Sequence, residues 1–213
     1  MSGPIRVSLM VTCLGDLFFP EVGVSIVRLL RRLGATVEFP RGQTCCGLPL
    51  FNSGYHAEAR RVAARTVALF RDADHVVVSS GSCAWMVKHV YPGLMGDPEL
   101  AGDARRLAER TWELSQFLVT VLGRSRFRST VRGRVTYHDS CHLLRGLHEA
   151  ESPRAVLRHL EGVEFVELPG ADEQTVEAGE AVVARAGVEH GLVNDGLAPL
   201  VTLVVVTPTP AHP

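Results

Sequence analysis

Four cysteines follow apolar segments that have the pattern of β-strands. They are Cys13 after Val7–Val11, Cys45 and Cys46 after Ala35–Phe39, and Cys83 after His75–Ser79. In a parallel α/β sheet all strands end at one edge, and ligand sites gather there. We therefore expect loops that are far apart in sequence to bring the four thiols together. A cluster of thiols in a chain of this size is most economically a metal site.

The adjacent pair Cys45-Cys46 favours iron–sulfur chemistry over zinc. Neighbouring thiolates are strained as ligands of one tetrahedral ion, whereas they can reach different irons of a polynuclear cluster. Gly47 permits a turn that exposes N–H groups to sulfide, and thiolates with nearby N–H donors are what an iron–sulfur cluster requires. Buried structural thiols, a zinc site and thiol–disulfide exchange at the pair are the alternatives.

A fifth cysteine, Cys141, follows a strand candidate at Arg134–His138. His138 and His142 flank it, and three potential ligands within five residues could join a zinc or cluster site. Ordinary loop chemistry is the competing interpretation. We keep Cys141 as a candidate metal ligand. No histidine is marked by its spacing as the partner of a nucleophilic cysteine, so the catalytic residues are unknown.

The composition indicates a globular protein that does not bind nucleic acid. Of its 213 residues, 46% are apolar and 21% charged, and the net charge is −1. This balance gives no electrostatic reason to bind nucleic acid or an anionic membrane. The apolar run Leu197–Val206 is about half the length of a membrane span. Without a secretory signal, and with an odd number of cysteines, we expect a cytoplasmic protein with metal or redox chemistry.

The order of the elements predicts an α/β fold with parallel strands and flanking helices, built from two repeated halves. Apolar stripes and capping residues predict helices from Pro20 to Gly34, from about Ala57, and from Asp97 to Gly123. Strand, cysteine, helix and strand then recur, with a helix opened by Ser152-Pro153 and a strand at Val163–Leu168. We expect a first cysteine-rich half at 1–123, an arginine-rich connector at 124–134, and an incomplete second half at 135–213.

Several motifs together are specific. They are Val11-Thr12-Cys13-Leu14, Gln43-Thr44-Cys45-Cys46-Gly47-Leu48-Pro49, Asn52-Ser53-Gly54-Tyr55-His56, Ser80-Gly81-Ser82-Cys83 and Tyr137-His138-Asp139-Ser140-Cys141-His142. Over roughly residues 5–174 the chain resembles the lactate-utilizing members of the CCG (cysteine-rich domain) iron–sulfur family. That family includes the cysteine-rich subunit of heterodisulfide reductase and the iron–sulfur subunit of glycolate oxidase.

The resemblance implies two α/β halves, each with a CCG motif, and [4Fe-4S] clusters that are non-cubane in some relatives. It also implies electron transfer together with two partner subunits that oxidise L-lactate to pyruvate, so that the chain is not catalytic alone. Carried over by position, Cys13, Cys45, Cys46 and Cys83 match the cofactor ligands of the first half. Cys141 matches the first cysteine of the second half.

The chain departs from the family pattern in its second half. No cysteine occurs after Cys141, although the family continues after Gln174 with a second Cys-Cys-Gly. This indicates a frameshift or a degenerate copy. From about residue 175 we expect poor packing, apart from a helix near Val176–Ala186 and a strand at Leu200–Val206. The alternative function is a non-enzymatic zinc-binding or metal-free interaction module left by truncation.

Overall fold

A computed structural model describes residues 3–129 and 132–167. The chain forms two compact units, Met1–Phe117 and Leu118–Pro213. The helix and strand expected after residue 175 lie outside the described residues. The domain limits expected at residues 123 and 134 stay predictions.

The first unit is built on a parallel sheet of four strands in the order β2-β1-β3-β4. The strands are β1 (Arg6–Met10), β2 (Thr36–Glu38), β3 (His75–Val78) and β4 (Thr111–Glu113). In the register of the sheet, Val7 of β1 lies between Val37 and His75. The two central strands form the core, in which Leu9 and Val77 are fully buried.

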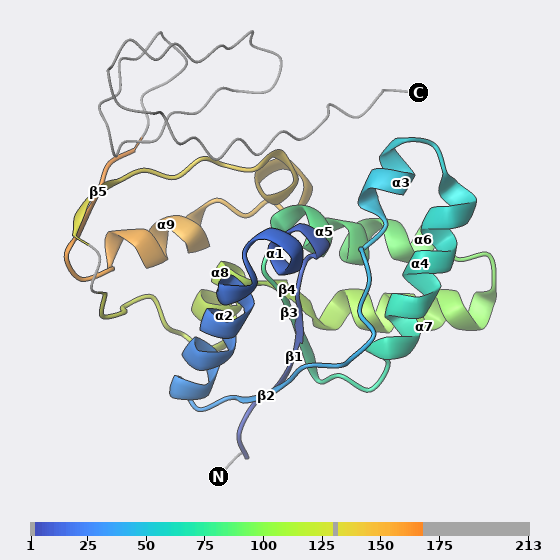
Figure 1. Ribbon diagram of the computed structural model, residues 1–213, viewed down its shortest axis with the longest axis horizontal. Helices are drawn as coiled ribbons and strands as arrows, with labels where there is room; N and C mark the ends of the chain where they lie inside the picture. The colour runs from blue at the N-terminus through green and yellow to red at the C-terminus, as the bar shows by residue number, and fades with distance from the viewer. Residues whose placement is uncertain (1–2, 130–131, 168–213) are drawn as a thin grey trace, which may run out of the picture. The chain divides into compact units, whose positions relative to one another are not determined.

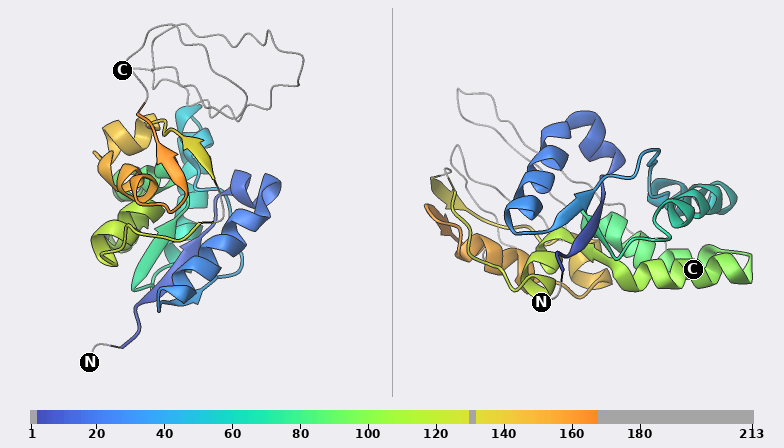
Figure 2. Two further views of the ribbon diagram at one scale, coloured as in Figure 1. Left: turned by 90° about the vertical axis from the view of Figure 1, so that its left-hand side faces the viewer. Right: turned by 90° about the horizontal axis from the view of Figure 1, so that it is seen from below.

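Helices cover both faces of this sheet. They are α1 (Cys13–Phe18), α2 (Pro20–Arg32), α3 (Leu48–Asn52), α4 (His56–Leu69), α5 (Gly81–Trp85), the π-helical η1 (Met86–Val90), α6 (Tyr91–Leu94), α7 (Pro98–Arg110) and α8 (Leu114–Gln116). The crossover connections place α2 on one face and α4 with α7 on the other, as Figure 1 and the view from below in Figure 2 show. The α/β prediction is confirmed.

The local signals in the sequence explain the first crossover. Pro20 occupies the first turn of α2, where its missing N–H group costs no hydrogen bond. Gly34 ends the helix at a φ of 88°, a conformation that glycine adopts without a steric penalty. The chain then enters β2, and its next crossover passes β1 to reach β3. The chain therefore adds β2 on one side of β1 and β3 on the other. The point between β1 and β3, where the strand order reverses, is where parallel α/β folds place ligands.

The prediction of one helix from Asp97 to Gly123 is wrong for its middle residues, Thr111–Glu113. Asp97 does cap α7, accepting a hydrogen bond from the Leu100 N–H group at 2.9 Å. The helix ends at Arg110, however, and Thr111–Glu113 forms β4 beside β3. The stripe of Leu107, Thr111 and Leu114 has helical spacing, but pairing with the exposed edge of β3 outweighs that periodicity. The Glu113 carboxylate then caps α8 through the Ser115 N–H group.

The second unit contains a smaller parallel pair of strands, β5 (Gly133–Val135) and β6 (Val163–Phe165). They are joined through the π-helical η3 (His142–Gly146) and α9 (Glu151–Arg158). The order strand, cysteine, helix, strand is therefore confirmed here. Arg154 of α9 forms a bidentate pair with Asp139, which anchors the segment before Cys141.

Within residues 3–129 and 132–167, none of the helices has both the length and the apolar character that a membrane span requires.

Candidate metal centre

The four first-unit cysteines all lie at the carboxyl-terminal edge of the sheet. Cys13 opens α1, and the Thr12 hydroxyl caps this helix by accepting a hydrogen bond from Gly15 N–H at 3.1 Å. Cys45 and Cys46 occupy the loop between β2 and α3, and Cys83 lies in the first turn of α5. Figure 1 shows α1 and α5 together at this edge.

The thiols form a continuous chain of neighbours. The Cys46 thiol donates to the Cys83 sulfur at 3.3 Å, and the Cys45 thiol interacts with both Cys46 and Cys13. Cys46 and Cys83 are 3% and 8% exposed, whereas Cys13 is exposed to solvent. The site thus has a buried end and an open end, and the structure brings together all four cysteines that the strand ends indicated.

The hydrogen bonds along this chain of thiols favour the thiolate form at Cys83. The bond from Cys46 lowers the pKa of Cys83, and it does so against the effect of burial. At Cys46 the bond from Cys45 lowers the pKa, but the bond to Cys83 and burial outweigh it and raise that pKa to about 12. The hydrogen bond with Cys46 and burial raise the pKa of Cys45. Burial raises the pKa of Cys13, and its hydrogen bond with Cys45 adds to this effect.

Because three of the four pKa values are raised, a metal must displace protons when it binds. Loading of the site should therefore weaken as the pH falls.

A thiol chain linked by protons also explains the spacing of the sulfurs. Two thiolates bound to one ion at about 2.3 Å would lie about 3.8 Å apart in tetrahedral geometry, farther than the 3.3 Å between Cys46 and Cys83. Accordingly, the described part of the chain holds no group of three or more acidic, cysteine or histidine side chains arranged around a single ion.

Gly47 shapes the loop that carries the doublet. Its φ is 88°, and its N–H group donates to the Cys45 sulfur at 3.4 Å. A Cβ atom at this position would lie 3.4 Å from the backbone oxygen of Ala59. The glycine therefore supplies both the backbone conformation and an N–H donor to sulfur, as the Cys-Cys-Gly tripeptide suggested.

Gln43 is a site residue that sequence reasoning missed. Its side-chain amide donates to Leu9 C=O at 2.9 Å and accepts from Val11 N–H at 3.0 Å. A neighbouring strand would make the same two contacts, but the last paired residue of β2 is Glu38. The amide of Gln43 thus replaces a peptide group beyond the end of β2 and ties the doublet loop to the strand that leads to Cys13.

Replacing Gln43 with Met should destabilise the chain by about 2–3 kcal/mol, because three hydrogen bonds of about 1 kcal/mol each are lost. The third bond is to Pro40 C=O at 3.1 Å. Denaturant unfolding measures the effect. The matched control is Gln116→Met, since Gln116 is half-buried but its side-chain oxygen accepts no hydrogen bond within the described residues. Equal losses of stability in the two variants would contradict this role of Gln43.

Cys141 belongs to the second unit. It precedes η3, and it is partly buried. His142 is buried, and burial lowers its pKa, while burial also lowers that of His138. Both imidazoles are therefore held in the neutral form that could bind a metal. That Cys141 is a ligand stays a prediction.

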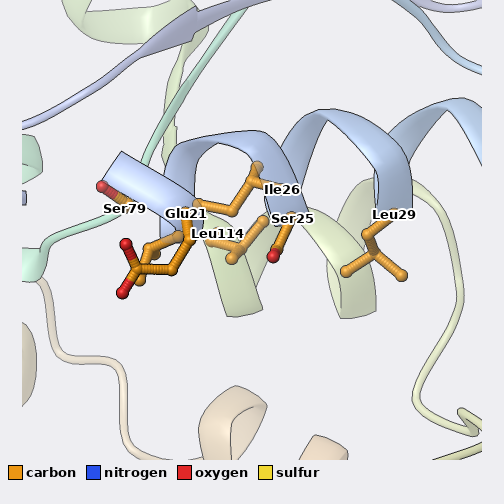
Figure 3. A pocket seen from close by; sticks show the side chains of 7 residues that line it. Glu21, Ser25, Ile26, Leu29, Ser79 and Leu114 are labelled. Carbon is orange, nitrogen blue, oxygen red and sulfur yellow. The ribbon is translucent and has the colours of Figure 1, made fainter. Parts of the chain in front are cut away.

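A hollow of about 390 Å³ lies against α2 in the first unit (Figure 3). It is lined by Glu21, Val22, Ser25, Ile26, Leu29, Ser79 and Leu114. This lining is mostly apolar, its one charged group is a carboxylate, and it includes no basic side chain. An anion would be repelled by Glu21, so the hollow does not have the chemistry of a binding site for a 2-hydroxy acid.

Comparison with known proteins links this geometry to a family. The model of the cysteine-rich domain family named CCG matches residues 7–88 and 135–176. The first segment includes Cys13, α2 and β2, and the second includes Cys141, α9 and β6, so each contains one of the two repeats in large part. Lactate utilization protein A of Geobacillus kaustophilus strain HTA426 is 46% identical over 192 residues, which are 90% of this chain and 80% of that protein. Lactate utilization protein A 2 of Bacillus cereus strain Q1 is 40% identical over 192 residues, which are 90% of this chain and 79% of that protein.

The extent of these matches corrects one expectation. The 192 matched residues exceed the span 5–174 over which the motifs indicated a resemblance. The family model itself ends at residue 176. The similarity therefore continues beyond Gln174, and the proposed frameshift there stays a prediction.

Proposed function

The chain belongs to the cysteine-rich CCG domain family, and we propose that it is the iron–sulfur electron-transfer subunit of a complex that oxidises L-lactate to pyruvate. The observation that carries this proposal is the convergence of the Cys13, Cys45, Cys46 and Cys83 thiols at one sheet edge. The names of the relatives, lactate utilization protein A, support the substrate.

The donor set fits an iron–sulfur cluster of the [4Fe-4S] type, cubane or non-cubane. Four thiolates satisfy the usual ligand number of such a cluster, and the adjacent pair suits ligands of two different irons. Gly47 N–H already donates to a sulfur, as such clusters require. When bound, the cluster would accept and pass on single electrons.

The residues of this chain would hold the cluster with one side sheltered and one side open. Cys46 and Cys83 are buried, so they would hold the cluster away from water, and low solvent exposure is one of the factors that set a cluster's potential. Cys13 is exposed and would mark the side at which an electron enters or leaves. The role requires thiolates that stay reduced, which the cytoplasm provides.

The chemistry also calls for partners. Oxidation of lactate to pyruvate removes two electrons and two protons, one proton from the C–H bond and one from the hydroxyl group of the same carbon, whereas one cluster accepts electrons singly. The apolar hollow beside α2 offers no cation for the lactate carboxylate. Partner subunits, of which the family resemblance implies two, would bind and deprotonate the substrate and supply further redox centres. Nucleic acid is not a partner in this proposal.

Anaerobic purification, followed by an absorption spectrum and assays for iron, acid-labile sulfide and zinc, tests the proposal. We expect broad visible absorption that bleaches on reduction, with iron and sulfide in comparable amounts. A colourless chain that holds zinc would support the non-enzymatic zinc-binding module instead, because zinc thiolates are redox-silent. A colourless chain without metal would support the metal-free interaction module. Either result would refute the iron–sulfur assignment.

A further inference from the structure

The peptide group of Cys46 is held by one buried side chain outside the cysteine loops. Tyr91, at the start of α6, is fully buried, and its hydroxyl donates to Cys46 C=O at 2.8 Å. Thr66, which is buried on α4, interacts with the Tyr91 side chain, while its own hydroxyl donates to Val62 C=O at 3.2 Å. The buried Tyr91 hydroxyl is therefore tied to the backbone of a cysteine of the candidate metal centre.

Tyr91 reaches Cys46 because the helix before it contains a π-turn. The segments α5, η1 and α6 run without a break from Gly81 to Leu94, and Tyr91 N–H donates to the Met86 carbonyl, five residues back. Cys83 and Tyr91 are eight residues apart. In a regular α-helix, eight steps of about 100° would leave them about 80° apart around the axis. One inserted residue leaves about seven effective steps, so they align to within about 20°.

Pro92 supplies a cause for the π-turn in the sequence. Proline has no N–H group, and in a regular helix its ring would clash with the carbonyl four residues earlier, which here is that of Lys88. Pro92 lies in the first turn of α6, directly after the widened segment. A wider turn relieves this clash. The sequence Tyr91-Pro92 thereby places a hydroxyl on the same helix face as Cys83.

We propose that Tyr91 is a positioning residue of the metal centre: aligned with Cys83 by the π-turn, it fixes the peptide of Cys46 and tunes the centre through that hydrogen bond. Two residues of one continuous helical segment then form hydrogen bonds with Cys46: Cys83 with its sulfur and Tyr91 with its carbonyl oxygen. This inference rests on the proposed function for the identity of the metal group, but the two hydrogen bonds to Cys46 are present without a metal.

Tyr91→Phe removes the hydroxyl and keeps the ring, and Tyr55→Phe is the matched control because Tyr55 is 60% exposed. In the metal-free chain, the rate at which Cys46 is alkylated, followed by mass spectrometry, should rise about tenfold in Tyr91→Phe, because the buried Cys46 carbonyl loses its donor and the loop that carries the thiol opens more often. In the iron-loaded chain we expect about tenfold faster iron loss to a chelator and a more negative midpoint potential. Tyr55→Phe should behave as the unmodified chain.

A second substitution keeps the test decisive if Tyr91→Phe does not fold. Placing 3-fluorotyrosine at position 91 retains the shape and strengthens the donor, so alkylation of Cys46 and iron loss should both slow, and the midpoint potential should rise. An unchanged alkylation rate of Cys46 in the variants that fold would overturn the inference. If the unmodified chain takes up no iron and sulfide, the proposed function fails, while the alkylation rates still decide the role of Tyr91.

Discussion

Replacing Cys45 or Cys46 with Ser is expected to abolish iron binding, whereas Cys141→Ser should leave most of the iron in place. The doublet lies at the centre of the chain of four thiols, so the loss of either sulfur divides the ligand set. Serine is a weak substitute because its hydroxyl remains protonated near neutral pH. Colorimetric iron assays on the three variants, normalised to protein, measure the effect.

Cys141→Ser is the internal control of that experiment. Cys141 lies in the second unit, where the chain has no Cys-Cys-Gly. Equal loss of iron in all three variants would mean that Cys141 completes a shared site. The division into a first-unit site and a separate second-unit cysteine would then be wrong.

Gly47→Ala should also remove most of the bound iron, although it adds only a methyl group. The φ of 88° costs an alanine about 1–2 kcal/mol. The loop can relieve this strain by turning the peptide that carries the N–H donor to Cys45. Chemical unfolding and iron content, measured together, separate the loss of stability from the loss of the site.

Gly54→Ala is the control for the strain alone. Gly54 has a φ of 81°, and a Cβ atom there would meet no atom within 4 Å. The two variants should lose similar stability, but Gly54→Ala should keep its iron. Parallel loss of iron in both would show that general destabilisation, and not the geometry of the doublet, empties the site.

The sequence predicted the fold where the local signals and the tertiary contacts agree. The Pro20 start and Gly34 end of α2 were recognisable because capping depends on a few neighbouring residues. β4 was missed because Thr111–Glu113 lies inside a stripe of helical period. Its identity as a strand depends on pairing with β3, which is a non-local contact.

The same distinction applies to the candidate site. The meeting of Cys13, Cys46 and Cys83 could be expected, since each follows a strand of one parallel sheet. Gln43 could not be identified, because its role depends on where β2 ends. Tyr91 could not be identified either, because no helix was expected between Cys83 and Tyr91 and its alignment with Cys83 depends on a π-turn.

Protection of individual cysteines from alkylation in the iron-loaded chain tests the central claim most directly. Mass spectrometry of the chain before and after anaerobic loading with iron and sulfide gives the reactivity of each thiol. Cys13 decides the result because it is exposed, so burial cannot protect it. The four-thiolate site predicts that Cys13 reacts in the metal-free chain and becomes protected on loading, together with Cys45, Cys46 and Cys83. A loaded chain in which Cys13 still reacts as fast as in the metal-free chain would contradict the account.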